Sequence, residues 1–352
     1  MAAIILQKNE RGLNDHVSVV KGIAILGVLW EHATVLFNIP VLSRYPSMLM
    51  LPLFVIASGY CFKDYYLTHR LTFVKHRIKS LYWPFVKWAA IFVLLHNIFC
   101  YIGFYPTNMG LYSWHDMLGQ IPHILVLHTF EPLIGANWFI AELFFGALLF
   151  IAFVPWIKRY PLAGVIGFAT VAIVLNLTGF HLRVRDVSLM CASYYTLGFW
   201  ARGCKLDTRL HIIILLVILL ILGALIVPGN FQEMDPRWIV PNYVTVILGS
   251  WLIAIIAWYI VKHGGWRLRS LAYIGNHTLI ILTLHFTAMH IVSWILTIVM
   301  DLPRECISEG LVIKGLVWSW PIYFIASVLI PLAFDFGNKK LCESLKNVCC
   351  KQ

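Results

Sequence analysis

Long apolar stretches, each about 20 residues in length, constrain this chain more than any other feature. Lipid supplies no hydrogen bonds to a backbone, so a segment of this length crosses a bilayer as a helix. Strands of a membrane barrel are shorter, and their apolar residues alternate with polar ones. The pattern therefore predicts an all-α, polytopic transmembrane helical bundle of about ten spans. They lie near residues 17–37, 46–62, 82–104, 136–157, 162–179, 187–201, 211–228, 242–261, 274–299 and 311–336.

The composition excludes most soluble classes. Only 12% of the residues are charged, against about 25% in ordinary soluble domains. A cytosolic enzyme, a disordered protein and a secreted disulfide scaffold are excluded on this ground. No stretch is left over for a soluble domain, so we expect residues 1–352 to form a single membrane domain. The eight cysteines are scattered without metal-ligand spacing, and no metal site is expected.

The basic residues predict an orientation. With the N-terminus inside, the inner segments hold 19 Lys and Arg residues and the outer segments hold 5. Positive residues gather on the cytoplasmic side of membrane proteins. We therefore expect both termini in the cytoplasm of a multi-pass protein of the plasma (inner) membrane. The net charge of +11 is then mostly a topology signal, and no nucleic-acid partner is expected.

Ionisable groups within membrane spans are costly and mark candidate sites. Lys21 and His32 are eleven residues apart, which places them on one helix face, about 16 Å apart along the axis. A cation at the membrane mouth suits an anionic cofactor, and an imidazole deeper in suits a general base. The spacing alone leaves open that Lys21 only extends to the interface and that His32 only bonds a neighbouring helix.

Several segments in order resemble the acyltransferase-3 family of integral membrane acyltransferases. The first-helix signature is Lys or Arg, ten residues, then His, as from Lys21 to His32. Further segments are similar to the family's second helix, its basic run before a proline, its Trp-Phe segment and a late helix that ends in His. They read MLPLFVIASGY (50–60), KHRIKSLYWP (75–84), NWFI (137–140) and IGNHTLIILTLH (274–285).

The resemblance implies a chemistry. Family members move an acyl group, commonly acetyl, from cytoplasmic acyl-CoA to a hydroxyl of a glycan or other acceptor. His32 would be catalytic, and acetyl-CoA would be held through its phosphates by Lys21, Arg77, Lys75 and Lys79. The acceptor would be a surface polysaccharide or its lipid-linked saccharide precursor. Ser80 stands where the family often has a second arginine of the basic run.

Other polar residues in or near the spans are weaker candidates. Glu142 is the second candidate catalytic residue, which could orient His32 or bind a sugar hydroxyl, or it could be a packing residue. Glu31, Trp138 and His285 are candidate substrate-binding residues. His96 and His290 fit core or interfacial positions better, and Ser58-Gly59 fits close helix packing. The connection 105–135 is rich in His and aromatic residues, which suits either a sugar platform or a plain interfacial loop.

Alternatives from other classes remain at this stage. A transporter or flippase for a lipid-linked sugar would use the same intramembrane charges. A structural or sensory membrane protein would gain nothing from them. Membrane lipids are expected partners, and a homo-oligomer is possible on this sequence.

Overall fold

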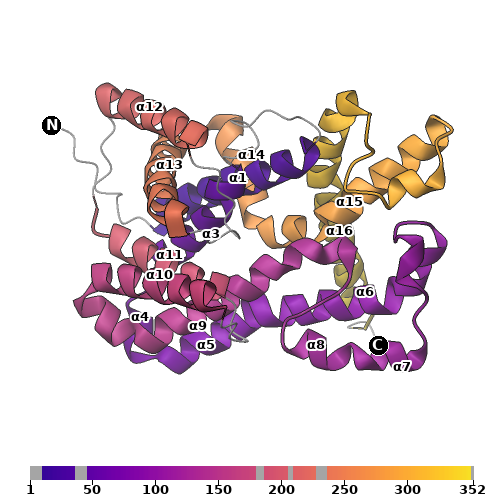
Figure 1. Ribbon diagram of the computed structural model, residues 1–352, viewed down its shortest axis with the longest axis horizontal. Helices are drawn as coiled ribbons and strands as arrows, with labels where there is room; N and C mark the ends of the chain where they lie inside the picture. Colours follow the sequence, from indigo (N-terminus) through magenta and orange to yellow (C-terminus); the bar gives the residue numbers. More distant parts are fainter. Residues whose placement is uncertain (1–9, 36–45, 180–185, 205–208, 227–235, 350–352) are drawn as a thin grey trace. The chain divides into compact units, whose positions relative to one another are not determined.

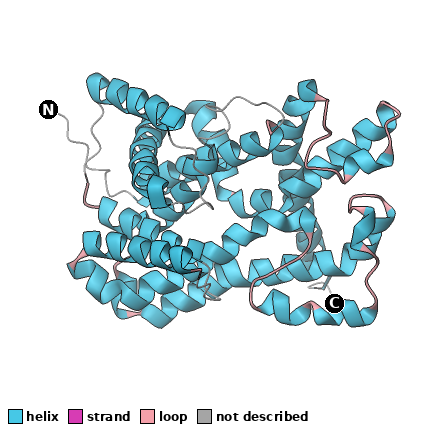
Figure 2. Ribbon diagram, in the orientation of Figure 1, coloured by secondary structure: helices cyan, strands magenta, loops and turns pink. Residues whose placement is uncertain are grey.

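A computed structural model describes residues 10–35, 46–179, 186–204, 209–226 and 236–349. Within these ranges every regular element is helical, and no strand occurs (Figure 2). The all-α prediction is confirmed for this part of the chain. Figure 1 labels the helices in chain order.

Each predicted span coincides with a helix, although the ends differ. The helices are α1 Glu10–Ala33, α3 Leu51–Tyr60, α6 Trp83–Tyr101, α9 Trp138–Arg159, α10 Pro161–Thr178, α11 Asp186–Ala201, α12 Leu210–Ile226, α13 Pro236–His263, α15 Thr278–Val299 and α16 Trp320–Cys349. Proline and glycine set several of these ends. For example, Pro161 opens α10, and Gly179, at φ +65°, closes it in the left-handed conformation that glycine adopts easily.

Six helices of the described chain are long and apolar enough to cross a membrane. They lie within 70–101, 132–159, 161–178, 237–263, 278–299 and 317–344. The shorter apolar helices Met48–Tyr60 and Leu210–Ile221 accompany them. The protein is thus a multi-pass helical membrane protein, and the count of ten spans and the inward termini stay predictions.

The last predicted span starts too early. The prediction placed it at 311–336, whereas α16 begins at Trp320. A positive φ of 89° at Gly315 turns the chain before the helix, and the 3-10 turn η6 (Val317–Ser319) leads into it. Lys314 therefore lies in this turn and pairs with Glu309 at 3.7 Å on the surface, outside any helix.

Short elements connect the long helices. Between α3 and α6 lie α4 (Tyr65–Thr68), α5 (Arg70–Arg77) and the π-helical turn η2 (Ile78–Tyr82). Between α6 and α9 lie the 3-10 turn η3 (Thr107–Met109), α7 (Trp114–Gly119), α8 (Ile121–Leu125) and η4 (Pro132–Asn137). The π-helical turn η1 (Pro46–Met50) precedes α3, α14 (Gly265–Asn276) precedes α15, and η5 (Arg304–Ile307) follows it.

The chain divides into two compact units that interleave along the sequence. The first contains residues 1–28, 38–86 and 138–276, and the second contains 29–37, 87–137 and 277–352. The expectation of a single domain over 1–352 is not tested by this division and stays a prediction.

In the first unit, α11 packs against α3, α9 and α10. Glycines allow the close approach. A Cβ on Gly59 of α3 would lie 2.0 Å from the Tyr195 carbonyl oxygen, and one on Gly198 of α11 would lie 2.1 Å from the Ile56 carbonyl oxygen. Each of the two helices thus presents a glycine to the other's backbone. The packing interpretation of Gly59 is confirmed, because any side chain there would collide with α11.

In the second unit, α15 packs against α16 and η4. Tyr323 of α16 is fully buried, and its hydroxyl shares a hydrogen bond of 2.8 Å with Ser293 of α15 and accepts one of 3.1 Å from the Ile313 backbone amide. Apolar residues from α1, α15 and the 311–316 turn surround this contact. The bonds fix the turn against both helices, which holds α15 in place.

Candidate functional site

One unbroken helix carries both residues of the first-helix signature. Lys21 and His32 lie on α1, and both side chains are half-buried. The eleven-residue separation along a continuous α-helix gives about 16 Å of rise and nearly the same face. The helical premise of the spacing argument is confirmed, and the roles of the two residues stay predictions.

His32 lies beside two rings of α15. Its ring centroid is 5.3 Å from that of His285 and 5.0 Å from that of Phe286, the latter in an edge-to-face arrangement. Figure 1 shows α15 in orange among the late helices of the chain. The structure thus brings two of the predicted site residues, His32 and His285, together within the second unit.

The hydrogen bonds of His285 define its protonation. Its side chain is completely buried, and Nδ1 lies 2.8 Å from the Leu282 carbonyl oxygen and 3.2 Å from that of Ile281. A carbonyl accepts but does not donate, so Nδ1 carries the hydrogen. Nε2 then has a free lone pair, and it finds no partner among the described residues. A buried base with an unused lone pair is uncommon and needs a specific explanation.

Asn137, which the sequence pattern did not single out, is a buried polar residue on an element that packs against α15. It ends η4, which packs on α15: the Thr287 hydroxyl donates to the Leu133 carbonyl at 3.3 Å. The Asn137 side chain is fully buried, and neither its amide nitrogen nor its oxygen has a partner within the described chain. The signal was its place at the head of the segment NWFI, where only the aromatic residue was weighed.

Glu142 has a specific partner on a neighbouring helix. Its carboxylate is buried on α9 and accepts a hydrogen bond of 2.5 Å from the Ser188 hydroxyl on α11. A buried carboxylate needs such donors. Trp138, four residues earlier, is half-buried, and its ring centroid lies 6.0 Å from that of Phe139. Both belong to the first unit.

The basic run is mostly exposed, with one exception. Lys75 and Lys79 are exposed, whereas Arg77 is half-buried and donates to the Tyr195 hydroxyl at 2.7 Å. The Arg77 guanidinium also lies 5.0 Å from the Phe73 ring. Its Nε–H and the Ser80 hydroxyl are buried without partners among the described residues. Arg77 is therefore held in a fixed position by Tyr195 and the Phe73 ring.

Three further charged residues in or near the predicted spans, Glu31, Lys87 and Lys314, are less informative. Glu31 is half-buried on α1, one residue before His32. Lys87 is exposed on α6, where its ammonium lies 5.6 Å from the Trp88 ring. Lys314 pairs with Glu309 instead of lying in a span. No described group of three His, Cys, Asp or Glu side chains is placed to hold a metal ion.

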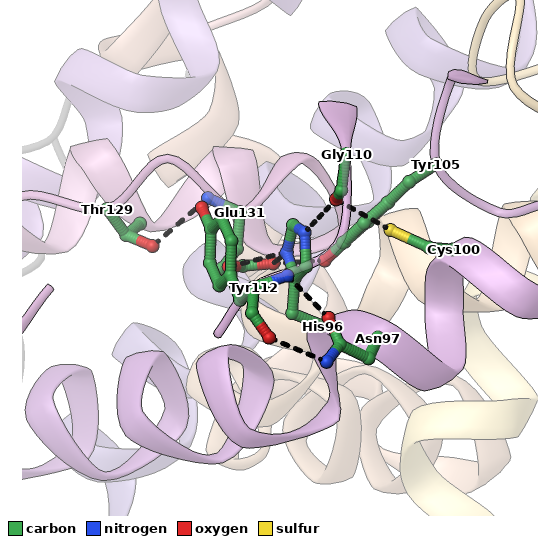
Figure 3. Close-up of polar contacts among 8 residues, drawn as sticks. All are labelled: His96, Asn97, Cys100, Tyr105, Gly110, Tyr112, Thr129 and Glu131. Carbon is green, nitrogen blue, oxygen red and sulfur yellow. Dashed lines mark hydrogen bonds and ion pairs between the residues drawn. The ribbon is translucent and has the colours of Figure 1, made fainter. Parts of the chain in front are cut away.

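A second buried histidine has all its hydrogen bonds made (Figure 3). His96 of α6 contacts the Glu131 carboxylate through Nδ1 at 3.1 Å and the Gly110 carbonyl through Nε2 at 3.1 Å. The Tyr105 hydroxyl donates to the other Glu131 oxygen at 2.5 Å. The Tyr112 ring stacks on His96 with centroids 3.5 Å apart. We call these residues the His96 cluster.

The His96 cluster fixes the protons as well as the chain. Nε2 must carry a hydrogen to donate to Gly110, and one further proton lies between Nδ1 and Glu131. Burial raises the pKa of Glu131, and the bonds from Tyr105 and His96 oppose the rise. Burial and the nearby Glu131 raise the pKa of Tyr105. The cluster joins α6 to the following connection, so the core interpretation of His96 agrees with its contacts.

The rest of the connection is used partly for structure. Asp116 and Ser113 form a reciprocal cap at the start of α7, and the hydrogen bonds from Ser113 lower the pKa of Asp116. Trp114 and Phe130 remain exposed. A cavity of about 340 Å³ lies beside the His96 cluster and includes Tyr105, Gly110 and Arg304 in its lining.

Comparison with known families identifies the chain. A family model described as an acyltransferase domain, that of the acyltransferase-3 family, matches residues 14–336. No curated protein and no solved structure matches. The match spans nearly the whole chain, including α1, η4 and α15. The chain therefore belongs to the acyltransferase-3 family and is a multi-pass membrane acyltransferase.

Proposed function

We propose that the protein is an O-acetyltransferase that moves acetyl from cytoplasmic acetyl-CoA to a hydroxyl of a surface polysaccharide or its lipid-linked precursor. The observation that carries the proposal is the pair formed by the half-buried His32 and the fully buried His285, whose ring centroids lie 5.3 Å apart. The unpaired Nε2 of His285 gives this pair a free basic site. Acyl transfer from a thioester to a hydroxyl needs a base that accepts the proton of the hydroxyl.

In the proposed reaction, His32 accepts the proton of the attacking hydroxyl. The hydroxyl oxygen forms a bond to the thioester carbonyl carbon, and the carbon–sulfur bond breaks. The leaving thiolate takes the proton back from the His32 imidazolium, so the free enzyme is restored. His285 holds the acceptor by accepting a hydrogen bond at Nε2, and the Asn137 amide is a donor for the negative oxygen that develops.

The donor site in this proposal is cationic. Lys21 and Arg77 bind the phosphates of the donor, and the exposed Lys75 and Lys79 add attraction. Support comes from the family match and from the fixed Arg77 guanidinium with its unused Nε–H. Arginine suits this role because its planar donors match phosphate oxygens.

The remaining assignments are also proposals. Glu142, Trp138 and Glu31 contribute to acceptor binding or orientation, and the protein acts in the plasma membrane among lipids. The hydrogen bond from the Ser188 hydroxyl supports a fixed position for the Glu142 side chain.

A test expresses the parent chain and its His32→Ala form in a host that makes the candidate glycan, and then weighs the glycan. We expect the mass of the glycan to show added acetyl groups only in the host that expresses the parent chain. His211→Ala, at an exposed histidine of α12, is the matched control. Equal acetylation by the parent and the His32→Ala form would overturn the role of His32.

The flippase alternative is separated by a labelled donor. A transferase moves label from acetyl-CoA into the glycan fraction, whereas a flippase moves its substrate without taking up label. The family match favours the transferase.

A further inference from the structure

An apolar pocket in the first unit is not used by the proposed reaction. It has a volume of about 480 Å³ and lies among α1, α3, α11 and α13. Its walls include Val20, Leu53, Ile56 and Leu197. Pockets that hold small molecules span about 300–1,000 Å³, so this one has room for an aliphatic chain.

The pocket opens toward the surface of the unit. Trp200 on α11 is 42% exposed, and Ile247 and Trp251 on α13 are 39% and 37% exposed, and all three line the pocket. Exposed apolar side chains of membrane helices face lipid. A chain can therefore enter sideways from the bilayer. On the inside, His16 of α1 ties to the Ala254 carbonyl on α13 at 2.9 Å.

Two cations are neighbours in the chain of residues that line the pocket. Lys63 lies three residues after Tyr60, and Arg202 lies between Ala201 and Cys204, all three of which line the pocket. Arg202 pairs with Asp64 at 2.8 Å, and its side chain is 29% exposed.

The apolar walls and the two neighbouring cations, Lys63 and Arg202, together define the chemistry of the ligand. An occupant needs an aliphatic chain and an anionic head, the combination found in an anionic phospholipid. Basic pockets between membrane helices on the positive side bind such headgroups. We propose that this pocket binds one acyl chain of an anionic phospholipid, with its phosphate on Lys63 and Arg202.

The acyl donor is a poorer fit to the same pocket. Val17 and Val20 line it, and they lie fifteen and twelve residues before His32 on α1. At 1.5 Å per residue these separations are about 22 Å and 18 Å along the helix. A thioester whose chain filled the pocket would stand far from His32. The lipid site is therefore distinct from the proposed reaction, and either can fail without the other.

The test uses the full chain in detergent with two lipid probes, dioleoylphosphatidylglycerol and dioleoylphosphatidylcholine, and native mass spectrometry to measure retained lipid. Ser250→Phe fills the pocket from α13. The Ser250 hydroxyl has no partner among the described residues, so its loss breaks no described hydrogen bond. Ile256→Phe, on the same helix but outside the pocket lining, is the matched control.

We expect the parent and Ile256→Phe to retain one phosphatidylglycerol with preference over phosphatidylcholine, and Ser250→Phe to lose most of it. Lys63→Gln with Arg202→Gln should reduce the preference about fivefold for each lost charge. Equal retention by Ser250→Phe and Ile256→Phe overturns the proposal. So does equal binding of the two lipids, or displacement of bound lipid by palmitoyl-CoA at equimolar concentration. The double charge variant decides the question if Ser250→Phe does not fold.

Discussion

Two buried histidines of the second unit differ in how their nitrogens are used. His96 has both ring nitrogens bonded, to Glu131 and to Gly110. His285 is equally buried, yet its Nε2 has no partner among the described residues, and the ring of His32 lies beside it. Burial alone therefore does not separate a structural histidine from a reactive one.

The two regions differ in how many of their buried hydrogen-bonding groups are paired within the protein. A fully bonded buried network stabilises one conformation and leaves nothing for a substrate. A buried polar atom without a hydrogen-bond partner costs stability and needs a specific explanation, such as a ligand or a reaction that uses it. We therefore assign the His96 cluster to the fold, and we propose the His32 and His285 pair for the chemistry.

The largest expected effect is on stability. Glu131→Ala leaves His96 and Tyr105 buried without their shared partner, and such a loss costs about 3–5 kcal/mol. Thermal melting of the purified protein in detergent should fall steeply. Glu305→Ala, at an exposed acidic residue of η5, is the control and should melt like the parent. A melting temperature of Glu131→Ala equal to that of the parent would contradict a structural role for the cluster.

The next effect is on the rate of transfer. His285→Gln removes the Nε2 acceptor that holds the attacking hydroxyl in the proposed reaction, and we expect about a 100-fold loss of acetyl transfer with little change in melting. His290→Gln is matched, because His290 is also buried on α15 and also bonds the carbonyl four residues earlier, at 2.9 Å from Phe286. The two substitutions thus share a helix and a local bond. Similar transfer rates in both variants would remove His285 from the site.

A smaller rate effect is expected at Asn137. Asn137→Ala removes an amide that has no partner among the described residues. The loss of one donor to a developing negative charge costs about 2.7–4 kcal/mol in the strongest cases, and we expect a loss of about 10-fold in the rate of transfer here. Melting should hold or rise, since no bond is broken. A lowered melting temperature with an unchanged rate would show that Asn137 is structural.

The smallest expected effect is the cap of α7. Ser113 lowers the pKa of Asp116, so the cap adds stability above the usual carboxyl pKa, about 3.9. That stability is lost as the pH falls through the lower pKa of the folded state. Ser113→Ala should remove this part of the acid dependence in melting curves between neutral and acid pH. An identical pH dependence in both proteins would show that the cap contributes nothing.

The sequence was informative about helices and about spacing within one helix. The apolar stretches predicted the positions of the helices, and the eleven-residue spacing placed Lys21 and His32 on α1. It did not predict features that depend on tertiary contacts or local turns, such as the first residue of the last helix. The start of α16 depends on the positive φ at Gly315, and the turn carries Lys314 out of the predicted span.

The polar partners could not be predicted for the same reason. His96 and Glu131 are separated by 35 residues, and Glu142 and Ser188 by 46. Residues this far apart in the chain lie on different elements, so helical periodicity does not show that they are in contact. The lack of a hydrogen-bond partner for His285 Nε2 among the described residues depends on the rotamer and neighbours of the ring, so only the structure shows it.

The most direct test of the central claim measures transfer from labelled acetyl-CoA and thermal melting on the same preparations of parent, His32→Ala and His96→Ala protein. We predict that His32→Ala loses transfer by about 10²–10⁴-fold and melts like the parent. His96→Ala should melt well below the parent and retain transfer in the fraction that stays folded. Full transfer by folded His32→Ala, or loss of transfer by folded His96→Ala at a temperature where it has not begun to melt, would contradict the account.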